Sequence, residues 1–243
     1  MLQLNSARFN RTDLPYFCYG DSRALYRENL HTQPADWTWR DQSIRYTLNT
    51  QGFRCPEFSD IDWASSIVCF GCSMTFGIGV DDNDTWVSQL GRELNCDTVN
   101  LAWPGASVSF MWANSVELIR AGITPRAVVY YWPEPSRVAE FTQPGRLFNW
   151  GVWEEQRQTR PWANSLGRAW IERDYHARKA AQLMIAGLHW PCPRLDLTWA
   201  WDGVYTGLAE HLHILEDRGR DLGHPGPHSQ GQFARAVATR LKI

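Results

Sequence analysis

From residue 66 onward, short runs of apolar residues alternate with longer segments in which apolar residues recur at every third or fourth position. Short apolar runs bounded by Gly or Pro are typical of buried strands. Three clear runs and a weaker fourth have this form, at residues 67–70, 98–102, 127–132 and 195–199. We therefore predict four buried strands.

The segments between these runs have the spacing of amphipathic helices. We predict helices over residues 85–94, 107–121, 172–189 and 229–241, the first of them capped by Asp82 or Asp84. The apolar residues of the second helix share one face: Val108, Met111, Trp112, Val116 and Ile119. Apolar strands that alternate with helices predict a mostly parallel sheet covered on both faces.

The rest of the chain is less regular. Residues 1–60 are polar, and Pro15, Pro34 and Pro56 would break any long helix there. No internal repeat or linker-like run divides the chain, and 243 residues suit one domain with a sizeable core. We expect a single domain over residues 1–243, with an irregular N-terminal segment (1–60) and a variable, Trp-rich segment (145–220) within it.

Composition excludes several classes of partner. The formal net charge of −2 gives no electrostatic reason to expect nucleic acid or an anionic membrane surface. No stretch reaches the roughly 18 apolar residues that a membrane span needs, and the first residues lack the basic and apolar regions of a secretory signal. We therefore expect a cytoplasmic protein. The six cysteines are widely spaced and are expected to be free, mostly buried thiols.

Ser73 is the first candidate for chemistry. It lies two residues past Gly71, at the carboxyl end of the first predicted strand, where parallel sheets bind ligands. A serine there can present its hydroxyl beside backbone N–H groups that bind an oxyanion, but it needs a base to become nucleophilic. The alternative is a helix cap or turn residue. The surrounding sequence is not the Gly-x-Ser-x-Gly elbow, because Thr75 stands two residues after the serine.

Asp221 and His224 are the second candidate. An aspartate three residues before a histidine, in a turn rich in Gly and Pro, can place its carboxylate on the ring N–H and so fix the tautomer. The alternative is a plain surface turn. His228 is a rival base, and the spacing from Asp221 favours His224.

Together these segments resemble the SGNH (GDSL-like) esterase family. Residues 71–77 (GCSMTFG) resemble its first block, residues 100–105 (NLAWPG) its second, and residues 221–226 (DLGHPG) its last. Residues 82–86 are similar to the acidic and Thr-Trp stretch that often follows the first block, and residues 49–54 (NTQGFR) to an upstream run of many members. The resemblance covers roughly residues 45–135 and 220–241.

The resemblance implies a three-layer α/β/α sandwich around a flavodoxin-like parallel sheet. It implies that Ser73 is the nucleophile, His224 the general base and Asp221 its orienter, with the N–H groups of Ser73 and Gly105 as oxyanion donors. Ester hydrolysis of a small-molecule or glycan ester follows, with no metal or organic cofactor. The sequence is silent on the acyl group and on the oligomeric state.

Two positions depart from the family pattern. Cys72 replaces the usual Asp before the serine, which is a mild change. Glu134 stands where the third block usually supplies an Asn donor to the oxyanion hole. An ionised carboxylate there would repel the oxyanion, and losing one donor typically costs about 10²–10³ in turnover. Arg137 is a candidate for a substitute positive charge. A weak or inactive module that binds a glycan or a protein therefore stays open as the alternative.

Three other patterns have simpler explanations. Cys69 and Cys72 form a C-x-x-C, but Cys69 falls inside an apolar strand, which argues against redox use. His211 and His213 would point to different sides of a helix, so we expect a partly exposed helix rather than a metal site. Half of the 14 tryptophans lie between residues 145 and 220. They fit either core packing or a lid that stacks on the substrate.

Overall fold

A computed structural model describes residues 13–17, 20–135, 137–142, 146–150, 175–200, 203–241 and 243. Within these residues the central feature is a five-stranded sheet in the order β4-β3-β5-β8-β9, in which every neighbouring pair is parallel. Its strands are β3 (Ile67–Phe70), β4 (Thr98–Asn100), β5 (Ala127–Trp132), β8 (Arg194–Thr198) and β9 (Glu210–His211).

The four predicted strands are confirmed, apart from small differences at their ends. β9 is a correction, because its residues form a short exposed strand beside β8 instead of the expected helix. Numbered along the chain, the five strands lie in the order 2-1-3-4-5, which is the flavodoxin-like order. In this order the chain reverses direction across the sheet between β3 and β5, and ligands bind at the carboxyl ends of strands beside that point.

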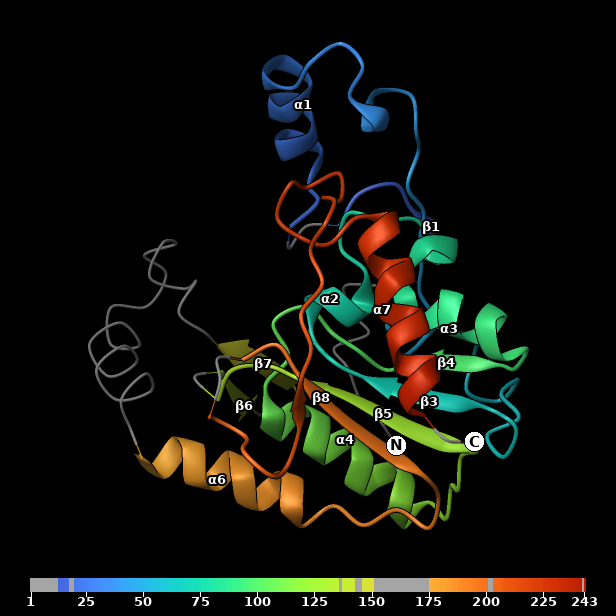
Figure 1. The fold of residues 1–243 in the computed structure, drawn as a ribbon, viewed down its shortest axis with the longest axis vertical. Helices are drawn as coiled ribbons and strands as arrows, with labels where there is room; N and C mark the ends of the chain where they lie inside the picture. The colour runs from blue at the N-terminus through green and yellow to red at the C-terminus, as the bar shows by residue number, and fades with distance from the viewer. Residues whose placement is uncertain are drawn as a thin grey trace.

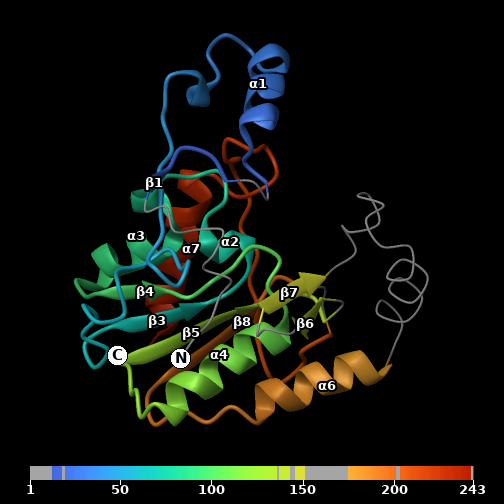
Figure 2. The ribbon, with the colours of Figure 1, turned by 180° about the vertical axis from the view of Figure 1, so that it is seen from behind.

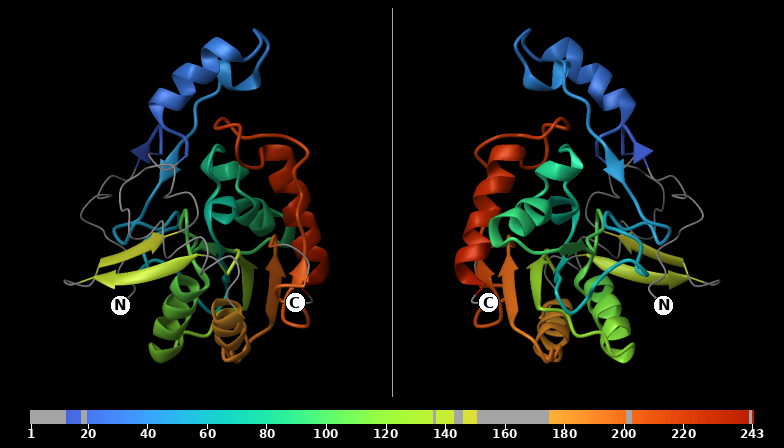
Figure 3. Two further views of the ribbon diagram at one scale, coloured as in Figure 1. Left: turned by 90° about the vertical axis from the view of Figure 1, so that its left-hand side faces the viewer. Right: turned by 90° about the vertical axis from the view of Figure 1, so that its right-hand side faces the viewer.

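Helices cover both faces of the sheet, so the predicted three-layer α/β/α sandwich is confirmed (Figures 1, 2 and 3). α3 (Trp86–Leu94) and α7 (Pro227–Arg240) lie on one face, and α4 (Val108–Arg120) and α6 (Tyr175–Ala186) lie on the other. Successive residues of β3 alternate between the two layers, since Cys69 packs with the α3–α7 side and Val68 with the α4 side. The apolar run of β3 is therefore buried on both faces.

The helices match the predicted ranges closely within the described residues, which leave out residues 172–174 of the third predicted helix. One correction concerns the start of α3. Its cap is Thr85, whose hydroxyl accepts a hydrogen bond from the Ser88 amide at 3.1 Å, and not Asp82 or Asp84. Those two aspartates are the first and last residues of a short 3-10 turn that precedes the cap. In α4 the predicted face is confirmed, because its apolar residues are buried or packed against the core.

The N-terminal segment is more ordered than its sequence suggests. β1 (Asp13–Leu14) pairs with β2 (Tyr46–Thr47), and α1 (Arg23–Thr32) and a 3-10 turn (Thr38–Arg40) lie between them. The helix corrects the expectation of a wholly irregular segment. α1 stands above the loop that leads into α7 (Figures 1 and 3). α2 is the short helix Ser73–Phe76. A separate cluster of buried apolar residues joins the N-terminal segment to α2 and to the turn that follows it.

The Trp-rich segment is described only in part. It contributes β7 (Arg146–Trp150), which pairs with β6 (Val138–Thr142) as an antiparallel hairpin. Trp153, Trp162, Trp170 and Trp201 lie outside the described residues, so the choice between core and lid is untested for them. Trp190 and Trp199 are partly buried against the core. In the described parts of the chain, no helix combines the length and apolar character of a membrane span.

Candidate active site

Ser73 lies where the sequence predicts, directly after the buried strand β3. It is the first residue of α2 and is half-buried. Gly71 makes the tight turn possible, because a Cβ on it would lie 2.0 Å from the Thr75 hydroxyl oxygen. Among the described residues, nothing forms a hydrogen bond with the Ser73 hydroxyl, and its carbonyl accepts from the Gly77 and Ile78 amides at 3.0 and 3.2 Å.

The segment after β4 lies beside this turn. The Leu101 amide donates to the Cys69 carbonyl at 2.9 Å, and the Trp103 amide donates to the Gly71 carbonyl at 3.2 Å. The chain then turns at Gly105, which has a φ of +79°. In the described part of the chain no hydrogen bond uses the Gly105 amide. The second sequence block is thus held against the first through backbone hydrogen bonds.

Asp221 and His224 are in direct contact. The Nδ1 atom of His224 lies 2.5 Å from the Oδ2 atom of Asp221, and the His224 amide donates to Oδ1 at 3.2 Å. The Asp221 side chain is 4 % exposed and the His224 side chain 21 %. A neutral imidazole whose Nδ1–H donates to this carboxylate keeps a lone pair on Nε2, which is the tautomer a general base needs.

The loop that carries this dyad is attached to the turn after α2. The Arg220 amide donates to the Gly79 carbonyl at 2.8 Å. The Gln230 side chain on α7 donates to the Met74 carbonyl at 3.2 Å. α2 and the turn after it are therefore bonded to α7 and to the loop that precedes it, although no hydrogen bond joins Ser73 and His224 themselves within the described residues.

Glu134 and Arg137 form an ion pair just beyond β5. The Nε atom of Arg137 lies 3.0 Å from a Glu134 carboxylate oxygen, and the guanidinium lies 5.0 Å from the centre of the Trp199 ring. The side chains are only 22 % and 10 % exposed, respectively. Burial, followed by the charge of Glu134, raises the pKa of the neighbouring Tyr205 above its ordinary value. The acid at the unusual position thus has its own counter-charge.

The rival patterns do not form competing sites in the described residues. His228 contacts Glu216 at 2.8 Å, and both side chains are more than half exposed. Cys69 and Cys72 are fully buried, and burial raises the pKa of the Cys69 thiol well above its ordinary value. Such a thiol is a poor redox nucleophile. No cluster of His, Cys, Asp and Glu suitable for a metal ion occurs in the described parts of the chain.

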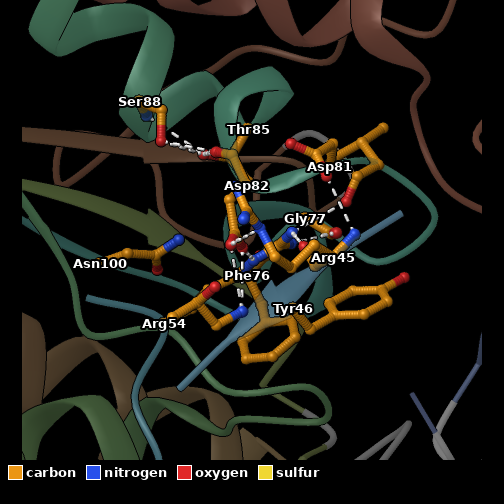
Figure 4. Close-up of polar contacts among 12 residues, drawn as sticks. Arg45, Tyr46, Arg54, Phe76, Gly77, Asp81, Asp82, Thr85, Ser88 and Asn100 are labelled. Atoms are coloured by element: carbon orange, nitrogen blue, oxygen red, sulfur yellow. Dashed lines mark hydrogen bonds and ion pairs between the residues drawn. The ribbon is translucent and has the colours of Figure 1, made fainter. Parts of the chain in front are cut away.

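Arg54, in the NTQGFR run, has a role that sequence reasoning missed. Its buried guanidinium donates to the Phe76 and Gly77 carbonyls at 2.9 and 2.7 Å, and to Asp82 at 2.5 Å (Figure 4). It therefore binds the carbonyls at the end of the helix that begins with Ser73. A second missed group is the buried pair of Asp21 and Arg220. Neither role has a local sequence signal, because both depend on distant segments.

No protein-family model and no curated protein matches this chain. A structure assigned to the lipolytic G-D-S-L family from Desulfitobacterium hafniense is similar at 13 % identity, with a TM-score of 0.41, over 72 % of this chain and 98 % of that one. A carbohydrate esterase family 2 enzyme from Corynascus thermopiles is similar at 14 % identity, with a TM-score of 0.45, over 73 % and 65 %. A carbohydrate acetylesterase family member from Sinorhizobium meliloti is similar at 11 % identity, with a TM-score of 0.44, over 73 % and 97 %.

The sequence blocks lie at defined places in the sheet. The sheet has the flavodoxin-like strand order, and the first two sequence blocks follow its first two strands in chain order. The last block precedes the final helix, which covers one face of the sheet. The chain therefore has a flavodoxin-like three-layer α/β/α fold.

Proposed function

We propose that the protein is a serine ester hydrolase in which Ser73 is the nucleophile, His224 the general base and Asp221 its orienter. The observation that carries the proposal is the 2.5 Å contact between Asp221 and the Nδ1 atom of His224, on a loop attached to the turn after α2. An imidazole held in this tautomer has an Nε2 lone pair ready to take a proton from a serine hydroxyl.

The reaction follows from these roles. His224 takes the Ser73 proton as the serine oxygen attacks the acyl carbon, and the amides of Ser73 and Gly105 donate to the resulting oxyanion. The ester C–O bond breaks, and the imidazolium of His224 protonates the leaving alcohol. Water, deprotonated by His224, then attacks the acyl carbon. The bond from that carbon to the Ser73 oxygen breaks, His224 returns the proton to the Ser73 oxygen, and the acid is released. The proposed substrate is an acyl or acetyl ester of a small molecule or glycan.

A fluorophosphonate probe tests the proposal, because it phosphonylates an activated serine. We expect the native protein to be labelled, with the adduct located on Ser73 by mass spectrometry. Ser73→Ala should abolish labelling and lower the turnover of aryl esters by up to about 10⁶-fold. Ser65→Ala is the matched control, since Ser65 is an exposed serine beside β3. Labelling that persists in Ser73→Ala would refute the role of this residue.

A second candidate is a non-catalytic module of the same fold that binds a glycan or a protein. Two observations favour it: the Ser73 hydroxyl has no hydrogen bond to His224 within the described residues, and an ion-paired Glu134 lies at the position of a usual oxyanion donor. The same probe separates the two functions. A folded native protein that is not labelled supports the binding module and excludes the hydrolase.

A further inference from the structure

Asp21 and Arg220 form a buried ion pair beside the dyad. The Arg220 guanidinium donates to both oxygens of the Asp21 carboxylate, at 2.9 and 2.6 Å, across 199 residues of sequence. The two side chains are 1 % and 3 % exposed, respectively. Arg220 is the residue immediately before Asp221, so a constraint on Arg220 is a constraint on the orienting carboxylate.

The rest of Arg220 is fixed as fully as its charge. Its carbonyl accepts from the Asn29 side chain at 3.0 Å, and its amide donates to the Gly79 carbonyl at 2.8 Å. The guanidinium also donates to the Pro15 carbonyl at 2.6 Å. Arg220 therefore has four hydrogen-bonding partners. Pro15, Asp21 and Asn29 lie in the N-terminal segment, and Gly79 lies in the turn after α2.

Tyr46 connects the ion pair to the turn that follows α2. Its hydroxyl donates to Asp21 at 2.6 Å and accepts from the Gly79 amide at 2.8 Å. Burial, and next the charge of Asp21, raises the pKa of Tyr46 well above its ordinary value, so the hydroxyl stays protonated and can donate. One chain of hydrogen bonds therefore runs from the turn after the Ser73 helix, through Tyr46 and Asp21, to Arg220.

The N-terminal segment also reaches the dyad itself. A Cβ on Gly20 would lie 3.8 Å from the Cε1 atom of His224 and 3.9 Å from the Oδ2 atom of Asp221, so the backbone at Gly20 lies beside the hydrogen bond between them. Next to it, Phe17 is fully buried, and its ring lies 4.7 Å from that of Phe76 and 5.9 Å from that of Trp103. The segment is thus in contact with both sides of the proposed site.

Stability alone does not account for such a pair. Burying two charges costs desolvation that their attraction often fails to offset, and apolar residues of similar volume are frequently as stable. Buried ion pairs can instead fix one arrangement of the groups around them. Here that arrangement includes the loop whose Asp221 oxygen must lie 2.5 Å from the imidazole.

We propose that Asp21 and Arg220 are positioning residues that hold the Asp221–His224 dyad in its productive geometry, and that Tyr46 couples them to the turn after the Ser73 helix. The inference rests on the proposed function. It makes the N-terminal segment, through Asp21 and Tyr46, a required part of the active site. None of the three residues touches the substrate in this scheme, since they act through Asp221.

The test substitutes Asp21→Asn, with Tyr46→Phe as a milder second variant. Asp21→Asn should lower kcat about a hundredfold with little change in KM, the effect expected of a displacement of about 1 Å in catalytic geometry. Tyr46→Phe, which loses hydrogen bonds to Asp21 and Gly79, should lower kcat about fivefold. The matched control is Asp196→Asn, which breaks the partly buried pair of Asp196 and Arg194 in β8, at 2.7 Å. It should leave kcat unchanged at temperatures well below its unfolding transition.

A direct readout is the proton NMR resonance of the His224 Nδ1–H, which a hydrogen bond as short as 2.5 Å shifts far downfield. Asp21→Asn should move this resonance upfield or broaden it, while Asp196→Asn should not. An unchanged resonance and an unchanged kcat in folded Asp21→Asn would overturn the inference. The resonance does not depend on turnover, so a native protein that fails to react with the fluorophosphonate refutes the proposed function while the resonance still decides the positioning role.

Discussion

Removing the Arg54 guanidinium should cost more stability than removing any exposed arginine. The Arg54 side chain is 2 % exposed and bonded to Asp82. It donates to four backbone carbonyls, those of Arg45, Phe76, Gly77 and Val80. It also lies 4.5 Å from the centre of the Tyr46 ring. Arg54→Met would keep much of the side-chain volume while leaving these acceptors without their donor.

The expected cost follows from these contacts. Breaking a buried ion pair by removing one partner typically costs about 3–5 kcal/mol. Asp82 is 21 % exposed and also accepts from the Thr47 amide, and the Gly77 carbonyl also accepts from the Val80 amide at 3.5 Å, so these two acceptors keep some compensation. We therefore expect a loss of about 4 kcal/mol in the free energy of unfolding. At about 2–4 °C per kcal/mol for a chain of this size, Tm should fall by about 8–16 °C.

Urea titration followed by tryptophan fluorescence measures the free energy, and differential scanning calorimetry measures Tm. Arg240→Met is the control, because Arg240 contacts Glu210 at 2.7 Å with both side chains at least one-third exposed. It should cost less than about 1 kcal/mol. If Arg54→Met lowered the free energy of unfolding no more than Arg240→Met, the contacts of Arg54 at the end of α2 would not have the stabilising role that we expect. Arg54→Lys should keep most of the loss, since one ammonium group cannot reach the same acceptors.

Two further substitutions test the loops around the dyad. Gly79→Ala should lower kcat and cost about 1–2 kcal/mol in backbone strain, because φ is +80° there and a Cβ would lie 2.6 Å from the Oδ1 atom of Asp221. Gly122→Ala is the control, because it has the same backbone strain, at φ +72°, but its Cβ would have nothing within 4 Å, so it should leave the kinetics unchanged. Equal kcat values in the two variants would contradict the predicted contact between residue 79 and Asp221. Asp217→Asn should cost about 1 kcal/mol at pH 7, because Asp217 accepts from the Ser229 and His228 amides at the start of α7, at 2.7 and 3.0 Å. Burial opposes the ionised form of Asp217, but these bonds outweigh it and hold its pKa below the ordinary value, so the wild-type advantage is present above pH about 3.9 and disappears as the pH falls through the lowered pKa. Urea midpoints measured from pH 7 to pH 3 check this, and a constant difference between the two proteins would refute it.

The sheet and its helices could be predicted because their signal is local. β3 and β5 are continuous apolar runs, buried on both faces, and their lengths and Gly or Pro boundaries leave little choice. α1 could not be predicted in this way, because Asn29 is its only buried residue in the described structure. That helix is stabilised by its Ser22 cap and by distant partners, such as the bond from Asn29 to Arg220. β9 is two exposed residues whose strand character comes from pairing with β8.

The candidate site likewise combines contacts that are local in sequence with contacts between distant segments. The contact between Asp221 and His224 spans three residues, so its spacing is visible in the sequence. Ser73 could be predicted as a candidate because it follows an apolar run that is typical of a buried strand. The contacts of Arg54 and Arg220 join segments far apart in the chain, and a single arginine or aspartate has no periodicity from which to predict a partner.

One close approach decides whether the two predicted halves of the site can meet. The turn after α2 touches the dyad loop at Gly79 and Gly219, and a Cβ on Gly219 would lie 2.9 Å from the Gly79 carbonyl oxygen. Any side chain at that point would separate the loops, and with them the bond from the Arg220 amide to Gly79. The same two turns also bind the N-terminal segment: the Gly79 amide donates to the Tyr46 hydroxyl, and the Arg220 side chain donates to Asp21. The position of His224 relative to Ser73 is therefore set by backbone contact between two turns, and the N-terminal segment fixes both turns at once.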